Sequence, residues 1–131
     1  GETKNPKTER IAGMCLALLT QIYEKSGGKL FYPEALWCGG SIKDQHREDN
    51  THTDHEDDIP KNMKVLKILG VLNSDWKEEW GGGFEWNKQT YYAPPTSFYV
   101  FNPLIPHRAA DIITHEKRIA IDFTVRSMIE F

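Results

Sequence analysis

The chain has 131 residues, of which 39% are hydrophobic and 11% aromatic, and its formal net charge is −3. This length suits one domain with a modest core, and the aromatic content excludes a chain without a fold. The slight acidity excludes a basic surface for general nucleic-acid or membrane binding, and no apolar run approaches the roughly 20 residues of a membrane span. The polar first ten residues and a cysteine count of two predict a cytoplasmic protein with reduced thiols.

Residues 8–26 carry the pattern of an amphipathic helix. The apolar side chains recur at spacings of three and four, at Ile11, Met14, Cys15, Leu18, Leu19 and Ile22. Thr8 is the expected cap at the start, and Gly27-Gly28 supplies the left-handed turn expected at the end. The apolar stripe predicts that this helix covers a sheet and that Cys15 is a buried thiol.

From Lys29 onward, short apolar and aromatic runs separated by turn residues predict strands. The run 65–72 is nearly continuous, which is typical of a strand buried on both faces. Gly39-Gly40 indicates a bulge or bend after the run 35–38. The remaining runs are 30–32, 84–86, 90–92, 97–101, 107–113 and 118–125. This pattern predicts a mainly β fold with a flanking N-terminal helix, a sandwich or barrel of the jelly-roll kind.

His52 and Asp54 stand two positions apart in the polar segment 43–62. On an extended strand these residues project from the same face, so an imidazole and a carboxylate can bind one ion. His107 is the best second histidine, and two histidines with one carboxylate are typical of non-haem Fe(II) oxygenases. The alternative is a solvated loop histidine, and competing ligands nearby are His46, His55, Glu56 and Asp57. The chain lacks the Cys-x-x-Cys and His-Glu-x-x-His motifs of zinc sites.

Arg118 follows His107 by eleven positions and begins the last apolar run. A guanidinium that faces the interior needs an anionic partner, and a carboxylate can accept two hydrogen bonds from it. The alternatives are a surface arginine or an internal salt bridge with Asp122 or Glu116. Arg126 is a second candidate, at the far end of the same strand.

Two lysines and a group of aromatic residues suggest further features of a site. Lys64 and Lys67 interrupt the apolar run, so one or both are expected to face the interior or the mouth of the fold. The aromatic group either packs the core or forms a rim that stacks on a ligand. The acidic run 54–58 favours a peptide or small-molecule partner over a nucleic acid. The aromatic group comprises Trp76, Trp80, Trp86, Tyr91 and Tyr92.

Several motifs occur in an order shared with a known family. They are His52-Thr53-Asp54, Val71-Leu72-Asn73, Trp76…Trp80-Gly81-Gly82, Val100-Phe101, Pro106-His107-Arg108 and Arg118-Ile119-Ala120-Ile121. With these motifs, residues 51–126 resemble the double-stranded β-helix core, a cupin-like jelly roll, of 2-oxoglutarate- and Fe(II)-dependent dioxygenases. The nearest branch is the prolyl 4-hydroxylase-like one. Gly83-Phe84-Glu85 departs from the family pattern, which more often has an acidic or small polar residue after the double glycine.

The resemblance implies one dioxygenase-like domain over residues 1–131, in which helix 8–26 supports the core 51–126. It implies His52, Asp54 and His107 as the catalytic Fe(II) ligands and Arg118 as the anchor of the distal carboxylate of 2-oxoglutarate. The implied activity is a hydroxylase that consumes O2 and 2-oxoglutarate, forms succinate and uses ascorbate as an accessory reductant. The leading substrate class is prolyl peptide.

Two other functions fit the same residues. The first is a non-catalytic β-barrel module that binds a peptide or carbohydrate through the aromatic group. The second is a cupin-type metalloenzyme that uses the ion without the keto acid. The sequence carries no indication of the oligomeric state.

Overall fold

The computed structural model describes residues 6–25, 27, 33–54, 64–94 and 97–127. Within these ranges the chain forms a long helix, a short 3-10 turn η2 (Glu78–Trp80) and strands in two antiparallel sheets. The elements are α1 (Pro6–Lys25), β1 (Pro33–Lys43), β2 (Lys64–Val71), β3 (Phe84–Trp86), β4 (Gln89–Tyr91), β5 (Phe98–Phe101), β6 (His107–Ala109) and β7 (Arg118–Ser127). The predicted mainly β fold with one N-terminal helix is therefore confirmed.

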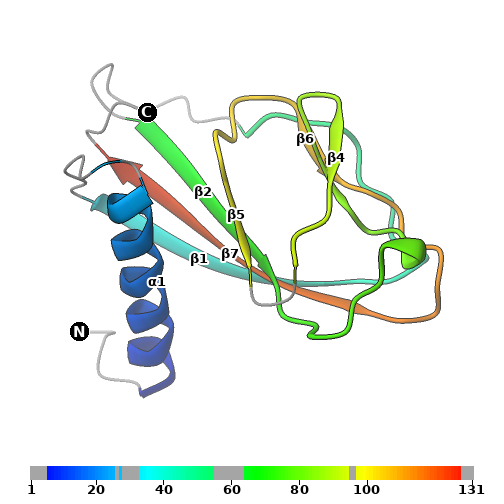
Figure 1. The fold of residues 1–131 in the computed structure, drawn as a ribbon, viewed down its shortest axis with the longest axis horizontal. Coiled ribbons are helices and arrows are strands. Elements are labelled where there is room, and N and C mark those ends of the chain that lie inside the picture. Colours follow the sequence, from blue (N-terminus) through cyan, green and yellow to red (C-terminus); the bar gives the residue numbers. More distant parts are fainter. Residues whose placement is uncertain (1–5, 26, 28–32, 55–63, 95–96, 128–131) are drawn as a thin grey trace.

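The strand order shows that the chain passes repeatedly between the two sheets. The larger sheet has the order β1-β7-β2-β5 and the smaller one β4-β3-β6. An isolated antiparallel bridge between His52 and His107 adds a further segment beside β6. The long strands β1, β2 and β7 run side by side, and α1 lies against one end of them, away from the smaller sheet (Figure 1). Because β1 pairs with β7 along nearly its whole length, the sheet begins well before residue 51.

Helix α1 begins at Pro6 and ends at Lys25. The prediction of Thr8 as the cap is wrong, because the helix starts two residues earlier. Proline suits a first helical turn, since its φ angle is already helical and the N–H that it lacks would have no partner within the helix. Gly27 has the predicted left-handed conformation, with φ of 78°. Gly28 lies outside the described residues.

The main core lies between α1 and the larger sheet. Its buried members are Cys15, Leu19, Ile68, Phe123 and Val125. The prediction that the helix covers a sheet is thus confirmed. Cys15 is the predicted buried thiol, and burial raises its pKa to about 11, so the group stays protonated and unreactive. No helix in the described ranges is long and apolar enough to cross a membrane.

Ile68 offers a test of this core. The side chain is fully buried against Phe123 and the helix. Replacing Ile68 by valine removes one methylene from a packed site, so we expect a loss of about 1 kcal/mol in the free energy of unfolding. Urea denaturation followed by circular dichroism measures it. An unchanged free energy would mean that α1 does not pack on β2.

The predicted bulge at Gly39-Gly40 is wrong. Strand β1 continues through both glycines, and its register shifts only between Pro33 and Ala35. A Cβ at Gly39 would lie 2.7 Å from Oδ1 of Asp122 on β7, so a larger residue there would have to displace that side chain. A glycine pair in a strand can therefore mark a close side-chain approach as well as a bulge. The predicted run 30–32 lies outside the described residues.

Candidate metal centre

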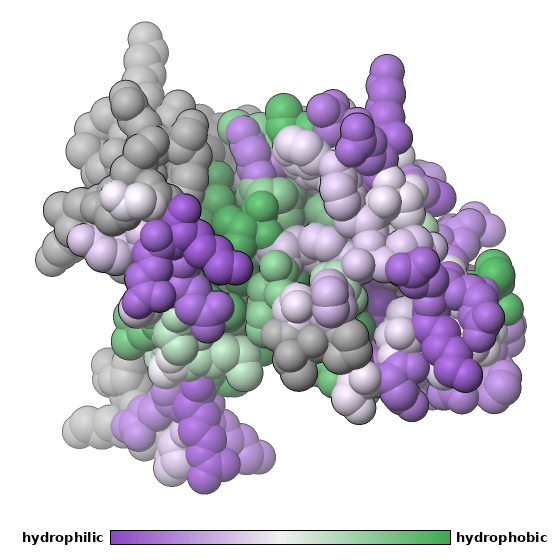
Figure 2. Space-filling model, viewed as in Figure 1, coloured by the Kyte–Doolittle hydropathy of each residue, from purple (hydrophilic) through white to green (hydrophobic). Residues whose placement is uncertain are grey.

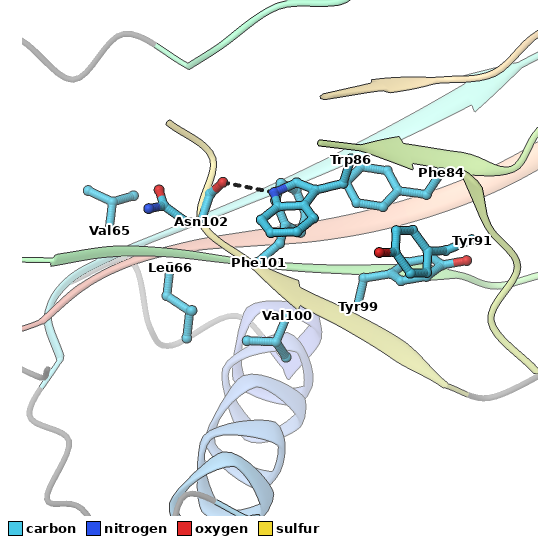
Figure 3. A pocket seen from close by; sticks show the side chains of 9 residues that line it. All are labelled: Val65, Leu66, Phe84, Trp86, Tyr91, Tyr99, Val100, Phe101 and Asn102. Carbon is cyan, nitrogen blue, oxygen red and sulfur yellow. Dashed lines mark hydrogen bonds between the residues drawn. The ribbon is translucent and has the colours of Figure 1, made fainter. Parts of the chain in front are cut away.

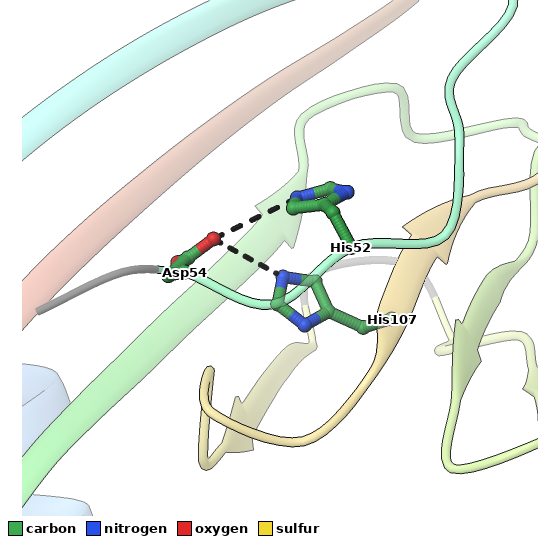
Figure 4. A group of neighbouring side chains, drawn as sticks. All are labelled: His52, Asp54 and His107. Carbon is green, nitrogen blue, oxygen red and sulfur yellow. Dashed lines mark ion pairs between the residues drawn. The ribbon is translucent and has the colours of Figure 1, made fainter.

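His52, Asp54 and His107 lie together although they come from distant parts of the chain. One ligand atom from each residue falls within 4.8 Å of the others. Nε2 of His52 lies 3.6 Å and Nε2 of His107 lies 3.5 Å from Oδ1 of Asp54. All three side chains point toward one another (Figure 4). The group that the sequence analysis proposed is therefore assembled in the structure.

The backbone brings these side chains together. His52 and His107 exchange two N–H to carbonyl hydrogen bonds of 3.0 and 2.9 Å, so they are directly opposed across an antiparallel bridge. Opposed residues project to the same face, which places the ring centroids 4.6 Å apart. The Asp54 N–H then donates to the Pro103 carbonyl at 3.0 Å. The expected strand around His52 is reduced to this single bridge, yet the expected same-face placement of His52 and Asp54 is retained.

Both imidazoles are oriented by backbone carbonyls. Nδ1 of His52 lies 2.8 Å from the Asn50 oxygen, and Nδ1 of His107 lies 2.7 Å from the Ile105 oxygen. A carbonyl oxygen only accepts hydrogen bonds, so each neutral ring carries its hydrogen on Nδ1. The lone pair is then on Nε2, the atom that faces Asp54. Metal-binding histidines in proteins are commonly held in this way.

Access to the centre is uneven. The side chain of His107 is 6% exposed and that of Asp54 is 22% exposed, whereas His52 is 52% exposed. An ion or substrate can therefore approach from the His52 side, while His107 forms the buried wall. The rings of Phe101 and Phe84 back that wall, with centroids 5.1 and 6.1 Å from His107.

Lys67 is the interior lysine that the sequence analysis expected near the site. Its Nζ lies 3.1 Å from Oδ2 of Asp54 and 3.4 Å from Oδ2 of Asp122. Burial by itself would lower the pKa of Lys67, but the two carboxylates raise it above its ordinary value. The group is therefore an ammonium ion beside the cluster. The side chain of Lys64 lies outside the described part of the chain.

Arg118 occupies a cavity of about 230 Å³ between the two sheets. Leu69, Trp76, Gly82, Tyr92, Tyr99 and Ala120 are among the lining residues. Arg118 is buried, with 7% of the residue exposed, and burial lowers the pKa of its guanidinium. Nη1 donates a hydrogen bond to the Gly82 carbonyl, and Nε has no hydrogen-bond partner among the described residues.

Neither of the acids considered as a salt-bridge partner binds Arg118. Asp122 pairs with Lys67, and Glu116 lies 3.6 Å from His115. Among the described residues, no carboxylate lies within ion-pairing distance of the guanidinium. Glu78 lines the same cavity, and the charge of Asp49 acts on the guanidinium without pairing with it. A buried guanidinium that has no direct ion pair leaves room for an anionic ligand in the cavity.

Gly82 makes room for this arrangement. Its φ angle is 72°, which glycine adopts readily, and a Cβ there would lie 3.1 to 3.2 Å from Ile112 and Trp76 and 3.5 Å from Arg118. Glycine therefore allows the backbone to approach the guanidinium closely. This contact gives a physical reason for the glycine run 81–83.

Strand alternation connects the cavity with the metal centre. Residues two apart on a strand face the same side, and Ala109, which lines the cavity, is two residues beyond His107 on β6. On β7, Arg118 and Ala120 line the cavity, and the next inward residue, Asp122, reaches the Lys67 ammonium. The cavity and the centre therefore lie side by side between the sheets.

A second cavity, of about 500 Å³, opens between β5 and the β3–β4 hairpin. Aromatic side chains dominate its lining (Figure 3), and apolar surface gathers around β5 on this face (Figure 2). The lining residues are Val65, Leu66, Phe84, Trp86, Tyr91, Tyr99, Val100, Phe101 and Asn102. We call this space the aromatic pocket. Phe84 and Phe101 line it and also pack against His107, so its wall is continuous with that of the centre.

The predicted aromatic group thus divides between two places. Trp86 and Tyr91 line the aromatic pocket, whereas Trp76 and Tyr92 line the Arg118 cavity. Trp80 packs edge-on against Trp76, with centroids 5.3 Å apart. Some members of the aromatic group therefore pack against each other, and others line a cavity.

A charged network that the sequence did not predict lies behind the histidines. Nζ of Lys43 is buried and donates to Oδ2 of Asp49 at 2.8 Å and to the Ala109 carbonyl at 3.0 Å. Arg108 donates to the Asp49 carbonyl at 3.2 Å and pairs with Glu85. Asp49 directly precedes Asn50, whose carbonyl orients His52. The network therefore joins the segment that carries His52 to the strand that carries His107.

Register explains why this network was missed. Lys43 pairs with Arg118 across β1 and β7, so both cations project between the sheets. The signal available in the sequence was Lys43 itself, a charged residue at the end of a run that forms a strand. Asp49 lies in the loop after β1, and only the path of that loop in the folded chain brings it to Lys43.

Asp49 gives the network a pH dependence. Burial by itself would raise the pKa of this carboxyl, but hydrogen bonds and charge from Lys43 and Arg47 hold it below its ordinary value. A depressed folded-state pKa gives stability that is present above the unfolded-state pKa and is lost as pH falls through the folded one. We expect Asp49→Asn to lower the free energy of unfolding at about pH 6 and to have less effect at about pH 2.5. Urea denaturation at both values measures this difference, and an equal loss at both would contradict the assignment.

The other candidate ligands take no part in the described cluster. His46 is exposed, and its backbone N–H donates to Asp44. His55, Glu56 and Asp57 lie outside the described residues. Arg126 remains at the far end of β7, where its register partner on β2 is Val65.

No protein-family model matches the chain, and no curated protein sequence matches it. Its function therefore has to be inferred from the chemistry of the site.

Proposed function

We propose that this chain is an Fe(II)- and 2-oxoglutarate-dependent dioxygenase that hydroxylates a substrate C–H bond. The observation that carries this proposal is the convergence of His52, Asp54 and His107, with both Nε2 atoms facing one carboxylate oxygen. Two imidazoles and a carboxylate on one side of an ion are the donor set typical of non-haem Fe(II) oxygenases. Thiolates, which zinc and iron–sulfur sites often use, are absent from the described cluster.

The arrangement of the strands supports a double-stranded β-helix, the fold that the sequence resemblance implies. Successive segments alternate between the larger and the smaller sheet, from β1 through the His52 bridge to β2, β3 and β4, β5, β6 and β7. His107 lies on β6 of the smaller sheet, and His52 is joined to it by an isolated antiparallel bridge. The position of Arg118 at the start of the last strand agrees with the same fold.

His52, Asp54 and His107 would hold the iron, leaving three of the six positions of an octahedral ion for the keto acid and O2. The bound Fe(II) would supply the oxidation in which R–H, O2 and 2-oxoglutarate give R–OH, succinate and CO2. The protein residues supply binding and orientation. The Asn50 and Ile105 carbonyls keep Nε2 of each histidine available as a ligand atom.

Arg118 would bind the distal carboxylate of the keto acid. The guanidinium lies in a cavity beside the centre and has no carboxylate partner among the described residues. A dicarboxylate held there by charge and hydrogen bonds would extend along the inward face of β7 toward Asp54. Leu69, Trp76 and Phe84 are among the walls of the cavity, and such apolar surroundings strengthen an ion pair.

The aromatic pocket supports prolyl peptide as the leading substrate class. Its walls suit an apolar ring, and Phe84 and Phe101 join it to His107. The same pocket favours a second candidate function, a non-catalytic module that binds a peptide or carbohydrate. The presence or absence of metal-dependent turnover distinguishes the two.

The test uses the purified protein with Fe(II), 2-oxoglutarate and ascorbate, and succinate is measured with and without a panel of proline-containing peptides. We expect slow succinate formation alone and faster formation with a substrate. Mn(II) with 2-oxoglutarate should raise the melting temperature, because ligands that bind only the folded state stabilise it. A binding module would give neither result. A cupin-type metalloenzyme would respond to Mn(II) but not to the keto acid.

A further inference from the structure

The two oxygens of Asp54 face different partners. Oδ1 faces both histidines, with Nε2 atoms at 3.6 and 3.5 Å. Oδ2 accepts a hydrogen bond from the Lys67 ammonium at 3.1 Å. Lys67 lies on β2, inside the larger sheet and between β7 and β5, so its position does not depend on the segment that carries Asp54. One oxygen is thus directed at the ion site and the other is held away from it.

This division matters because a carboxylate can bind a metal ion through one or two oxygens. An ion bound through both oxygens of Asp54 would have one position fewer for other ligands. The proposed co-substrate needs two adjacent positions and O2 needs a third. Restricting Asp54 to one oxygen therefore keeps the number of open positions that the reaction requires.

We propose that Lys67 is a positioning residue that limits Asp54 to one ligand oxygen and so keeps a third metal position open. This inference rests on the proposed function, since it requires an ion at the His52, Asp54 and His107 cluster. Lys67 acts through Asp54 and does not itself contact the reacting atoms.

Asp122 is the second carboxylate that contacts the Lys67 ammonium. Its Oδ2 lies 3.4 Å from Nζ of Lys67. A lone ammonium beside a divalent cation would repel it, and the Asp122 carboxylate offsets this repulsion. Gly39 leaves the space that Asp122 occupies, because any Cβ there would contact its carboxylate. The Lys67 ammonium is therefore held by two carboxylates, Asp54 and Asp122, and lies where it can fix the orientation of Asp54.

Lys67→Met provides the test, and Mn(II) is the probe. Water-proton relaxation counts the solvent molecules on bound Mn(II), and titration calorimetry gives the affinities for Mn(II) and then for 2-oxoglutarate. We expect three bound waters in the wild type and two in Lys67→Met, because Oδ2 becomes free to bind the ion. Mn(II) should bind as tightly as before or more tightly, while 2-oxoglutarate should bind about tenfold more weakly.

A residue that merely supported the fold would behave differently, since its loss would weaken Mn(II) binding itself. Lys67→Arg is the matched control. Its guanidinium keeps the charge and the hydrogen bond to Oδ2, so the water count and the keto-acid affinity should stay near those of the wild type. Circular dichroism of the metal-free proteins compares their folding. A water count of three in Lys67→Met, or weaker Mn(II) binding by that variant, would overturn the proposal.

Asp122→Asn keeps the proposal testable if Lys67→Met does not fold. Without the Asp122 charge, the ammonium repels the ion more strongly, so Mn(II) should bind about tenfold more weakly with the water count still three. A count of two in this variant would overturn the proposal. If the wild type binds no Mn(II), the metal centre itself is refuted. If it binds Mn(II) and the variants match it, only the role of Lys67 is refuted.

Discussion

Replacing Asp54 by alanine is expected to lower iron-dependent succinate formation at least ~100-fold. The change removes the anionic ligand and leaves two neutral imidazoles, one of them half-exposed. It also leaves the Lys67 ammonium beside the site with only Asp122 to balance it. The remaining donors would hold a divalent ion weakly, so turnover and the Mn(II)-induced rise in melting temperature should be lost together.

Asp75→Ala is a matched control for this prediction, because Asp75 is an exposed acid in the turn after β2. It removes the same charge from the chain without touching the cluster, and turnover should be unchanged. Equal succinate formation by the wild type and Asp54→Ala would contradict the ligand assignment. Because the backbone N–H of residue 54 still donates to Pro103, the local fold should persist in the variant.

Replacing Arg118 by alanine is expected to raise the apparent KM for 2-oxoglutarate about 100-fold while leaving the affinity for Mn(II) nearly unchanged. The guanidinium lies in the cavity beside the metal centre, whereas the three proposed metal ligands do not line that cavity. Its loss removes the ion pair with the distal carboxylate but no metal ligand. Steady-state kinetics with varied 2-oxoglutarate and calorimetry with Mn(II) measure the two effects separately.

The Arg118 change also affects stability, since the Gly82 carbonyl loses its donor. An unpaired buried carbonyl costs about 1–3 kcal/mol, so the free energy of unfolding should be measured beside the kinetics. Arg118→Lys is the control that keeps a cation in the cavity, and it should recover part of the keto-acid affinity. An unchanged KM in Arg118→Ala would favour a cupin-type metalloenzyme, which does not bind a keto acid there.

The candidate site was largely readable from the sequence because its first two ligands are close neighbours. His52 and Asp54 share a face by the geometry of any extended backbone, whatever the rest of the fold does. Arg118 was recognisable as a cation at the start of an apolar strand. Pairing them with His107, however, required a bridge between segments 55 residues apart, which residue spacing does not specify.

The sequence by itself determined the elements whose patterns depend on neighbouring residues, which are helix α1 and the inner strand β2. Tertiary structure alone decided the partners of the buried charges. Lys67 meets Asp122 because β2 and β7 pair in antiparallel register, and it meets Asp54 in the segment that is hydrogen-bonded to Pro103. Lys43 meets Asp49 in the loop that follows β1. A shift of one residue would turn every side chain of a strand to the opposite face, so such contacts depend on the whole sheet.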